Sequence, residues 1–243
     1  MDDVQKLFEF TIRKLPEQLG VIVLPDEYFY QSLTLAAIDA VYSPQARYST
    51  VQNVVDRYCK KYALARNRSP RDSLPQPQDQ EKVSELIQKM MKEGSSNFAE
   101  NIFENRSITA GRLKADVLLD LLIEIQDLNI QTFQDIQPWL IQYSLQCKLV
   151  RKITNIDGIG EATSRYFLML AGDEQMVKPD RMILRFICNV LNRRVNEEYA
   201  VTLIQALSKK LLTTYPHMTP RLLDYIIWTW QRNQPIQNNN RGC

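Results

Sequence analysis

The chain has 243 residues, of which 44% are apolar, 24% are charged and only 7 are glycine, and its net charge is +2. No apolar run reaches the ~20 residues of a membrane span, and the acidic, then amphipathic start does not have the form of a signal peptide. Four scattered cysteines and a single histidine argue against a zinc or iron–sulfur site. We therefore expect a cytoplasmic protein that needs no metal or cofactor and does not enter membranes.

Helical periodicity dominates the chain. The only segment that looks like a β-strand is the short "GVIVL" at 20–24, and the polar, proline-containing segment 66–80 is typical of a loop or linker. Apolar residues recur at helical spacing in 83–91, where Gly94 provides a C-cap, and again in 113–122. Together these features predict an all-α fold.

Helix starts are also readable in the last third of the chain. Asn196 precedes one helical pattern, and Thr219 followed by Pro220 precedes another, as N-caps and first-turn prolines do. The tail from 233 onward is polar and is predicted to fray.

A tight glycine pair interrupts two helical patterns at "NIDGIGEATSRYF". The pattern predicts a helix, a turn at Asp157-Gly158-Ile159-Gly160, and a second helix that starts near Glu161. The free N–H groups at such a start form an anion site that would suit a DNA phosphate. A corner that only packs is the plainer interpretation, because short glycine motifs recur often.

The surroundings of this turn resemble the helix-hairpin-helix superfamily of DNA glycosylases, whose members include endonuclease III-like enzymes. The turn lies in "LVRKITNIDGIGEATSRYFLML", and in that family an aspartate follows eighteen residues after the position of Ala162, which leads to Asp180 in "KPDRMILRF". The stretches "LAAIDAVYSPQARYSTVQNVVDRY" and "RLKADVLLDLL" resemble two earlier helices of the family. The resemblance covers about residues 30–190.

The resemblance implies a role for each matching residue. Asp180 would be the catalytic carboxylate that stabilises positive charge on the deoxyribose. Gln45 would fill the gap left by a flipped base. The remaining DNA contacts would be Gly158, Ile159, Gly160, Arg47 and Arg185. A base pocket would involve Asp39 and Tyr42, although Tyr42 is more typical of a core aromatic and Asp39 fits a surface residue equally well.

Four departures from the family pattern bear on the chemistry. Asp157 replaces the usual proline of the turn, and Arg181-Met182 replaces a Thr-His pair after the aspartate. Ala162 stands where the lyase members carry a lysine, and alanine cannot form a Schiff base. The four-cysteine cluster of some members is missing as well. Asp180 also fits a plain N-cap of the helix that follows it.

The resemblance implies two helical lobes with a DNA-binding cleft between them: a barrel lobe at 28–165, and a second lobe made of 1–27 and 178–243. It implies a monomeric, monofunctional DNA glycosylase that binds double-stranded DNA and leaves an abasic site during base excision. Repair of damaged bases and removal of modified bases from phage DNA both remain open. The alternatives are an inactive DNA-binding module and a helical adaptor with no nucleic-acid role.

Overall fold

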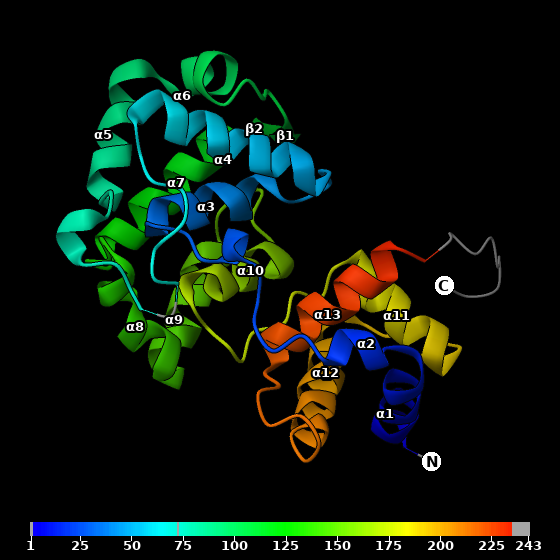
Figure 1. The fold of residues 1–243 in the computed structure, drawn as a ribbon. Helices are drawn as coiled ribbons and strands as arrows, with labels where there is room; N and C mark the ends of the chain where they lie inside the picture. Colours follow the sequence, from blue (N-terminus) through cyan, green and yellow to red (C-terminus); the bar gives the residue numbers. More distant parts are fainter. Residues whose placement is uncertain (1, 72, 235–243) are drawn as a thin grey trace. The chain divides into compact units, whose positions relative to one another are not determined.

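The protein, described by a computed structural model at residues 2–71 and 73–234, is built almost entirely of helices (Figure 1). Its backbone divides into two compact units. Unit 1 comprises Met1–Leu24 and Glu174–Cys243, and unit 2 comprises Pro25–Asp173. The sequence predicted lobes of 28–165 and of 1–27 with 178–243. In the structure the boundaries between the units fall between residues 24 and 25 and between residues 173 and 174.

Unit 2 is organised around one buried helix, α3 (Leu33–Tyr42), every residue of which is buried. Its sequence, LTLAAIDAVY, is apolar on nearly all sides, as expected for a helix that is covered all round. It packs against α4 (Tyr48–Tyr62), α5 (Val83–Glu93), α7 (Lys114–Asp127) and α10 (Glu161–Ala171) (Figure 1). The other elements of unit 2 are α6 (Ser95–Asn97), α8 (Phe133–Ile141), α9 (Tyr143–Thr154), the single turns Asp26–Tyr28, Pro77–Asp79 and Phe98–Ile102, and the strands β1 (Ile108–Thr109) and β2 (Arg112–Leu113).

A buried carboxylate joins separate parts of unit 2. Glu81 accepts hydrogen bonds from the hydroxyls of Thr34, at 2.7 Å, and Tyr58, at 2.5 Å, and pairs with the Lys89 ammonium at 2.5 Å. The Lys89 ammonium also lies 4.3 Å from the centre of the Tyr62 ring. Both carboxylate oxygens are therefore satisfied, which a buried charge requires if it is not to destabilise the fold.

Unit 1 brings the two ends of the chain together. It contains α1 (Asp3–Lys14), α2 (Pro16–Leu19), α11 (Arg181–Leu191), α12 (Glu197–Leu211) and α13 (Pro220–Arg232). Phe10 of α1, Phe186 of α11 and Trp230 of α13 meet edge to face, with ring centres 5.8–5.9 Å apart. These contacts fix the N-terminal helix onto the C-terminal ones, and aromatic pairs of this kind stabilise a core by about 0.5–1.5 kcal/mol each beyond their buried area.

The predicted helix ends are confirmed. The Asn196 side chain accepts from the N–H of Tyr199, and the Thr219 hydroxyl accepts from the N–H of Leu222, with Pro220 in the first turn. Gly94 ends α5 with a φ of 82°. All-α is thus the correct class, with one exception among the described residues: the two-residue strands of a small hairpin.

Two local predictions have different outcomes. Segment 20–24 is irregular backbone and not a strand. Segment 66–80 is a loop of unit 2 that contains one short turn, Pro77–Asp79, and does not connect the two units. Most of the tail that was predicted to fray, 235–243, lies outside the described residues.

Candidate functional site

The glycine turn joins α9 to α10, and its first glycine is required by the backbone. Gly158 has a φ of 101°, and a Cβ at this position would lie 2.8 Å from Cγ2 of Thr109 and 3.1 Å from Cγ2 of Val117. The Thr109 hydroxyl donates to the Gly158 carbonyl at 3.3 Å. Only glycine combines this φ with such a close approach. The β1–β2 hairpin and α7 therefore pack against the turn at Gly158.

The second half of the turn has no such contacts. Ile159 is 4% exposed and anchors the turn in the core, whereas Gly160 is exposed, with nothing within 4 Å of a Cβ built on it. Gly160 is the N-cap of α10 and, having no side chain, leaves the first N–H groups of the helix without a cap. Glu161 follows, and its carboxylate pairs with Arg165 at 3.4 Å. The uncapped N–H groups can bind an anion, with Glu161 close beside them.

Asp180 lies in unit 1, at the start of α11. Its Oδ1 accepts from the N–H groups of Met182, at 2.7 Å, and Ile183, at 3.2 Å, so the carboxylate is an N-cap. Among the described residues no hydrogen bond reaches its Oδ2. Asp180 is only partly buried, and Arg181 beside it is exposed. One oxygen is thus fixed by the start of α11, whereas the other accepts no hydrogen bond from the described residues.

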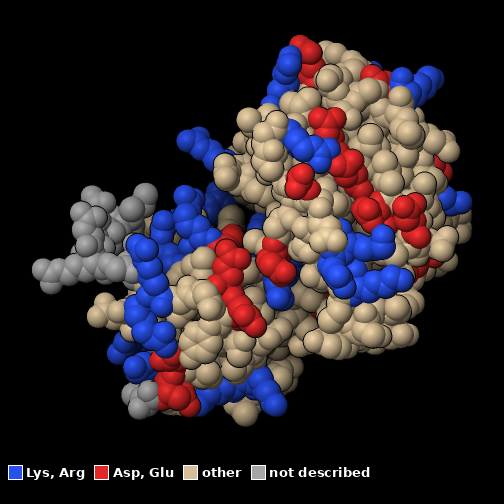
Figure 2. Space-filling view, turned by 180° about the vertical axis from the view of Figure 1, so that it is seen from behind, with Lys and Arg blue, Asp and Glu red and all other residues tan. Residues whose placement is uncertain are grey.

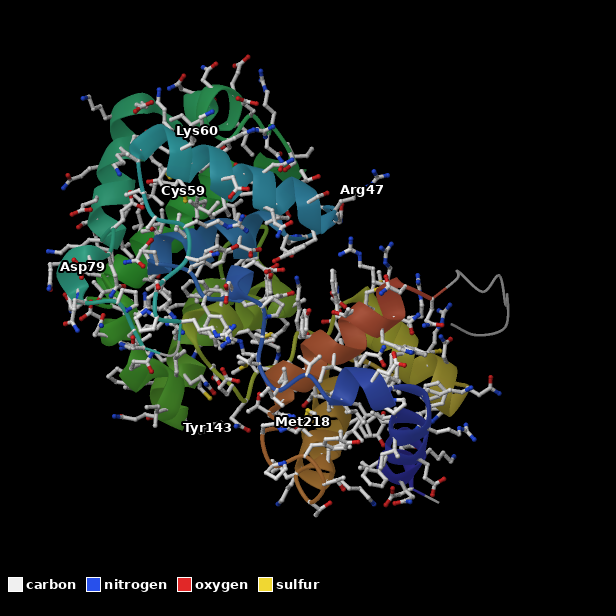
Figure 3. All side chains as sticks on the ribbon, in the orientation of Figure 1. Arg47, Cys59, Lys60, Asp79, Tyr143 and Met218 are labelled. Atoms are coloured by element: carbon white, nitrogen blue, oxygen red, sulfur yellow. The ribbon has the colours of Figure 1, made fainter. Side chains whose placement is uncertain are left out.

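The corner between α3 and α4 carries Gln45 and Arg47, which are both exposed. Gln45 has a φ of 59°, in the left-handed region, and the Arg47 side chain points away from the helices of unit 2 (Figure 3). Beneath the corner lies Lys114, which is 3% exposed and donates to the carbonyls of Tyr42, at 3.0 Å, and Pro44, at 2.7 Å. This buried ammonium holds the corner in its present conformation.

The two residues predicted for a base pocket are both buried. Asp39, 1% exposed, accepts from the hydroxyls of Tyr30 at 2.7 Å and Tyr166 at 3.3 Å. Burial, followed by the charge of Asp39, raises the pKa of both phenols well above the usual value. Tyr42 is 1% exposed and packs edge to face on Phe103. Both side chains are therefore part of the core of unit 2.

The candidate residues are distributed over both units. Asp180 and the half-buried Arg185 belong to unit 1, while Gln45, Arg47 and Gly158–Gly160 belong to unit 2. The charge is also unevenly divided: unit 1 has 13 Lys and Arg against 9 Asp and Glu, and unit 2 has 17 against 19. Figure 2 shows Lys and Arg side chains side by side on unit 1. The positive charge that favours polyanions is thus greater on the unit that carries Asp180.

Two residues with close connections to these positions were not found from the sequence. Lys114 has the form of an ordinary surface lysine at the start of a helical pattern, and only the folded chain shows it under the Gln45 corner. Asp224, in α13, accepts from the backbone N–H of Lys178 at 2.9 Å, two residues before Asp180. A charged residue within the apolar pattern 219–230 was the one available signal for Asp224.

Across residues 2–71 and 73–234 no cluster of His, Cys, Asp and Glu has the arrangement of a metal site. No helix in the same part of the chain is both long and apolar enough to span a membrane.

Comparison with known proteins places the chain in a family without giving it an activity. No curated protein and no solved structure gives a significant match. One family model, described as a domain of unknown function (DUF8548), matches residues 9–232 and so covers helices of both units. The chain belongs to the DUF8548 family.

Proposed function

We propose that this protein is a monofunctional DNA glycosylase, which binds double-stranded DNA as a monomer, flips out one damaged or modified base and hydrolyses its N-glycosidic bond. The bond breaks with its electron pair going to the base, water adds to the cationic sugar, the proton that water loses ends on the base, and an abasic site remains. Repair and the removal of modified phage bases are both compatible with this activity. The DNA cleft predicted between two lobes is part of the proposal.

The observation that carries the proposal is the state of the Asp180 carboxylate. The two N–H groups of α11 fix one oxygen, and the other takes no hydrogen bond from the described residues. A carboxylate held in this way can stabilise the positive charge that builds on the sugar ring as the base leaves. Lys178, Arg181 and Arg185 lie within five residues of it in the chain and could balance nearby phosphates.

The turn of unit 2 supplies a second, independent support. The uncapped N–H groups at the start of α10 could bind a phosphate. Gly160 would let a DNA backbone come close, because no atom lies within 4 Å of the position that a Cβ would take there. The exposed Lys148 and Arg151 of α9 add positive charge on the helix that precedes the turn. Such contacts would fix the position of the duplex without reading its sequence.

An inactive DNA-binding module is the second candidate. The observation that favours it is the N-cap of α11, because capping alone accounts for an aspartate at position 180. Ala162, at the place of the lyase lysine, removes one known route to strand cleavage. The module would keep the turn and the basic residues and would release no base.

The two candidates differ in a base-release assay. Wild type and Asp180→Asn would be incubated with duplexes that each contain one damaged, deaminated or mismatched base, and with phage DNA that carries modified bases. Alkali then cleaves at abasic sites. We expect cleavage only after alkali, with one class of substrate, and a loss of about 100-fold or more in Asp180→Asn. No covalent complex should be trapped by borohydride.

Asp2→Asn is the matched control, because Asp2 is also an N-cap aspartate of unit 1 and accepts from the N–H of Gln5. Asparagine caps helices about as well as aspartate, so both variants should remain folded. A rate lost in Asp180→Asn but kept in Asp2→Asn assigns catalysis to Asp180. If no substrate loses a base while the duplex is still bound, the module is correct and the glycosylase is not.

Salt dependence of duplex binding tests the adaptor alternative. Each phosphate contact contributes about −0.9 to the slope of log affinity against log salt concentration for double-stranded DNA. We expect a slope of several units, which should become less steep in Arg185→Ala. Absence of any salt-dependent binding would refute both DNA-based proposals.

A further inference from the structure

Asp224 is a buried carboxyl group for which the proposed chemistry gives no role. It lies in the second turn of α13 and is 6% exposed. Its Oδ2 accepts the backbone N–H of Lys178 at 2.9 Å. Two residues later, the N–H of Asp180 donates to the Lys178 carbonyl at 2.7 Å, which closes a tight turn across Pro179. The side chain of Asp224 thus holds the same short turn that delivers Asp180 to the start of α11.

Burial and the nearby charge of Asp180 favour the protonated form of Asp224. Burial is the main reason that its pKa lies well above the usual value, and the like charge of Asp180 raises it further. The N–H and the ammonium group of Lys178 act in the opposite direction. Arg221, three residues earlier in α13, binds Glu174 at 2.8 Å. Two carboxyl groups thus lie at one turn, and burial together with the neighbouring charge favours the protonated form of Asp224.

We propose that Asp224 is a positioning residue for Asp180: its carboxyl group accepts the Lys178 N–H and thereby fixes the Lys178–Asp180 turn, which places the Asp180 carboxylate at the start of α11. The catalytic part of this inference rests on the proposed glycosylase activity. The link between the two carboxyl groups does not rest on that activity. It follows from the hydrogen bond to Lys178, the burial of Asp224 and its position in unit 1.

The link is tested by carbon-13 NMR of aspartate carboxyl groups over a pH titration. The Asp224 signal is assigned by its loss in Asp224→Asn. We expect its midpoint to lie above that of exposed aspartates and to fall by about half a pH unit or more in Asp180→Asn, because a like charge has been removed. Asp2→Asn, which removes a carboxylate at another helix start of unit 1, should leave the midpoint in place. An ordinary midpoint, or one that does not change in Asp180→Asn, would overturn the proposal.

Positioning is tested by two substitutions of Asp224. Alanine removes the acceptor for the Lys178 N–H, and we expect kcat to fall roughly 10- to 100-fold while the Kd for DNA is kept, as for a misplaced catalytic group. Asparagine keeps an acceptor and no charge, so it should rescue most of that loss and should also remove the decline in rate at high pH that follows ionisation of Asp224. A loss in Asp224→Asn as large as in Asp180→Asn would show that a charged Asp224 is needed, which contradicts the proposal.

A third measurement separates failure of this inference from failure of the proposed function. Amide hydrogen exchange at Met182 and Ile183 reports the hydrogen bonds that Asp180 makes. We expect faster exchange at these amides in Asp224→Ala and slow exchange in Asp224→Asn. If the wild type releases no base but this pattern and the coupled titration hold, the glycosylase proposal fails and Asp224 still positions Asp180. Unchanged exchange in Asp224→Ala would show that it does not.

Discussion

Gly158→Ala tests how firmly unit 2 fixes the turn before α10. The new methyl group would lie 2.8 Å from Cγ2 of Thr109, closer than real Cβ contacts allow, and 3.1 Å from Cγ2 of Val117, which is a tight contact. The backbone would also have to keep a φ of 101° with an L side chain. The hairpin that carries Thr109, or the turn itself, must therefore move.

The cost has two parts. A left-handed backbone costs an L residue about 1–2 kcal/mol, and an extra methyl group in a filled space costs about 1–3 kcal/mol. Together they predict a loss of about 2–5 kcal/mol in the free energy of unfolding, a large share of the ~5–15 kcal/mol of an ordinary domain. Gly160→Ala is the matched control, because its φ of −94° is ordinary and its Cβ would meet nothing. Its cost should stay below about 1 kcal/mol, as for an N-cap change.

Urea denaturation measures both variants, with hydrogen exchange of peptides from unit 2 to show where stability is lost. With a slope of about 1–3 kcal/mol per molar urea, the Gly158→Ala midpoint should fall by roughly 1 M or more. Thr109→Ser removes the nearer methyl group but keeps the hydroxyl that donates to Gly158. In that background Gly158→Ala should cost roughly 1 kcal/mol less. Equal losses in the two glycine variants, or no relief from Thr109→Ser, would refute the steric account.

Three further predictions concern buried ionisable groups. The pKa of Asp224 is raised on folding, so the stability that its protonated form contributes is complete at a pH below the unfolded pKa near 3.8. That contribution is lost as the pH rises through the folded pKa. In urea titrations, Asp224→Asn should therefore become more stable relative to wild type as the pH rises. Lys114→Met leaves the carbonyls of Tyr42 and Pro44 without their donor and should cost about 1–3 kcal/mol, with faster amide exchange at 43–47. Glu81→Gln removes the carboxylate that the half-buried Lys89 ammonium and the Thr34 and Tyr58 hydroxyls share, and should lower stability by about 1–3 kcal/mol in thermal or urea unfolding; a loss below about 0.5 kcal/mol would contradict this.

Features set by neighbouring residues could be predicted from the sequence. The caps at Asn196 and Thr219 depend on a side chain and an N–H three residues later, so a short segment contains all the information. Gly94 is a similar case at a helix end. Periodic apolar spacing gave the helices and the all-α class for the same reason.

Features that join distant segments could not be predicted. Asp39 accepts a hydrogen bond from Tyr166, which is 127 residues away. The sequence left Asp39 between a base pocket and the surface, because its own helix gives no sign of that partner. The β1–β2 hairpin has strands of only two residues, and its turn depends on Ala110 at a φ of 49° and Gly111 at 76°. No strand pattern exists at that length.

The candidate site divides in the same way. The spacing from the glycine turn to Asp180 is a property of the chain, and it selected an aspartate that caps a helix. The partners that hold these positions, Lys114 and Asp224, come from helices 70 and 46 residues away from their acceptor and donor. Supporting residues of this kind are visible only once the chain has folded.

The buried and half-buried tyrosines of unit 2 also allow its unfolding to be followed by absorbance. Six of them have a pKa raised chiefly by burial: Tyr30, Tyr42, Tyr48, Tyr58, Tyr62 and Tyr166. In the unfolded chain these groups ionise near pH 10. As the pH rises past that value, their ionisation favours the unfolded chain, so the free energy of unfolding of unit 2 decreases. In unit 1 the pKa of Tyr199 is raised chiefly by its hydrogen bond to Asp3. The ultraviolet absorbance of these six tyrosinates should therefore appear in one cooperative step, at the pH where unit 2 unfolds.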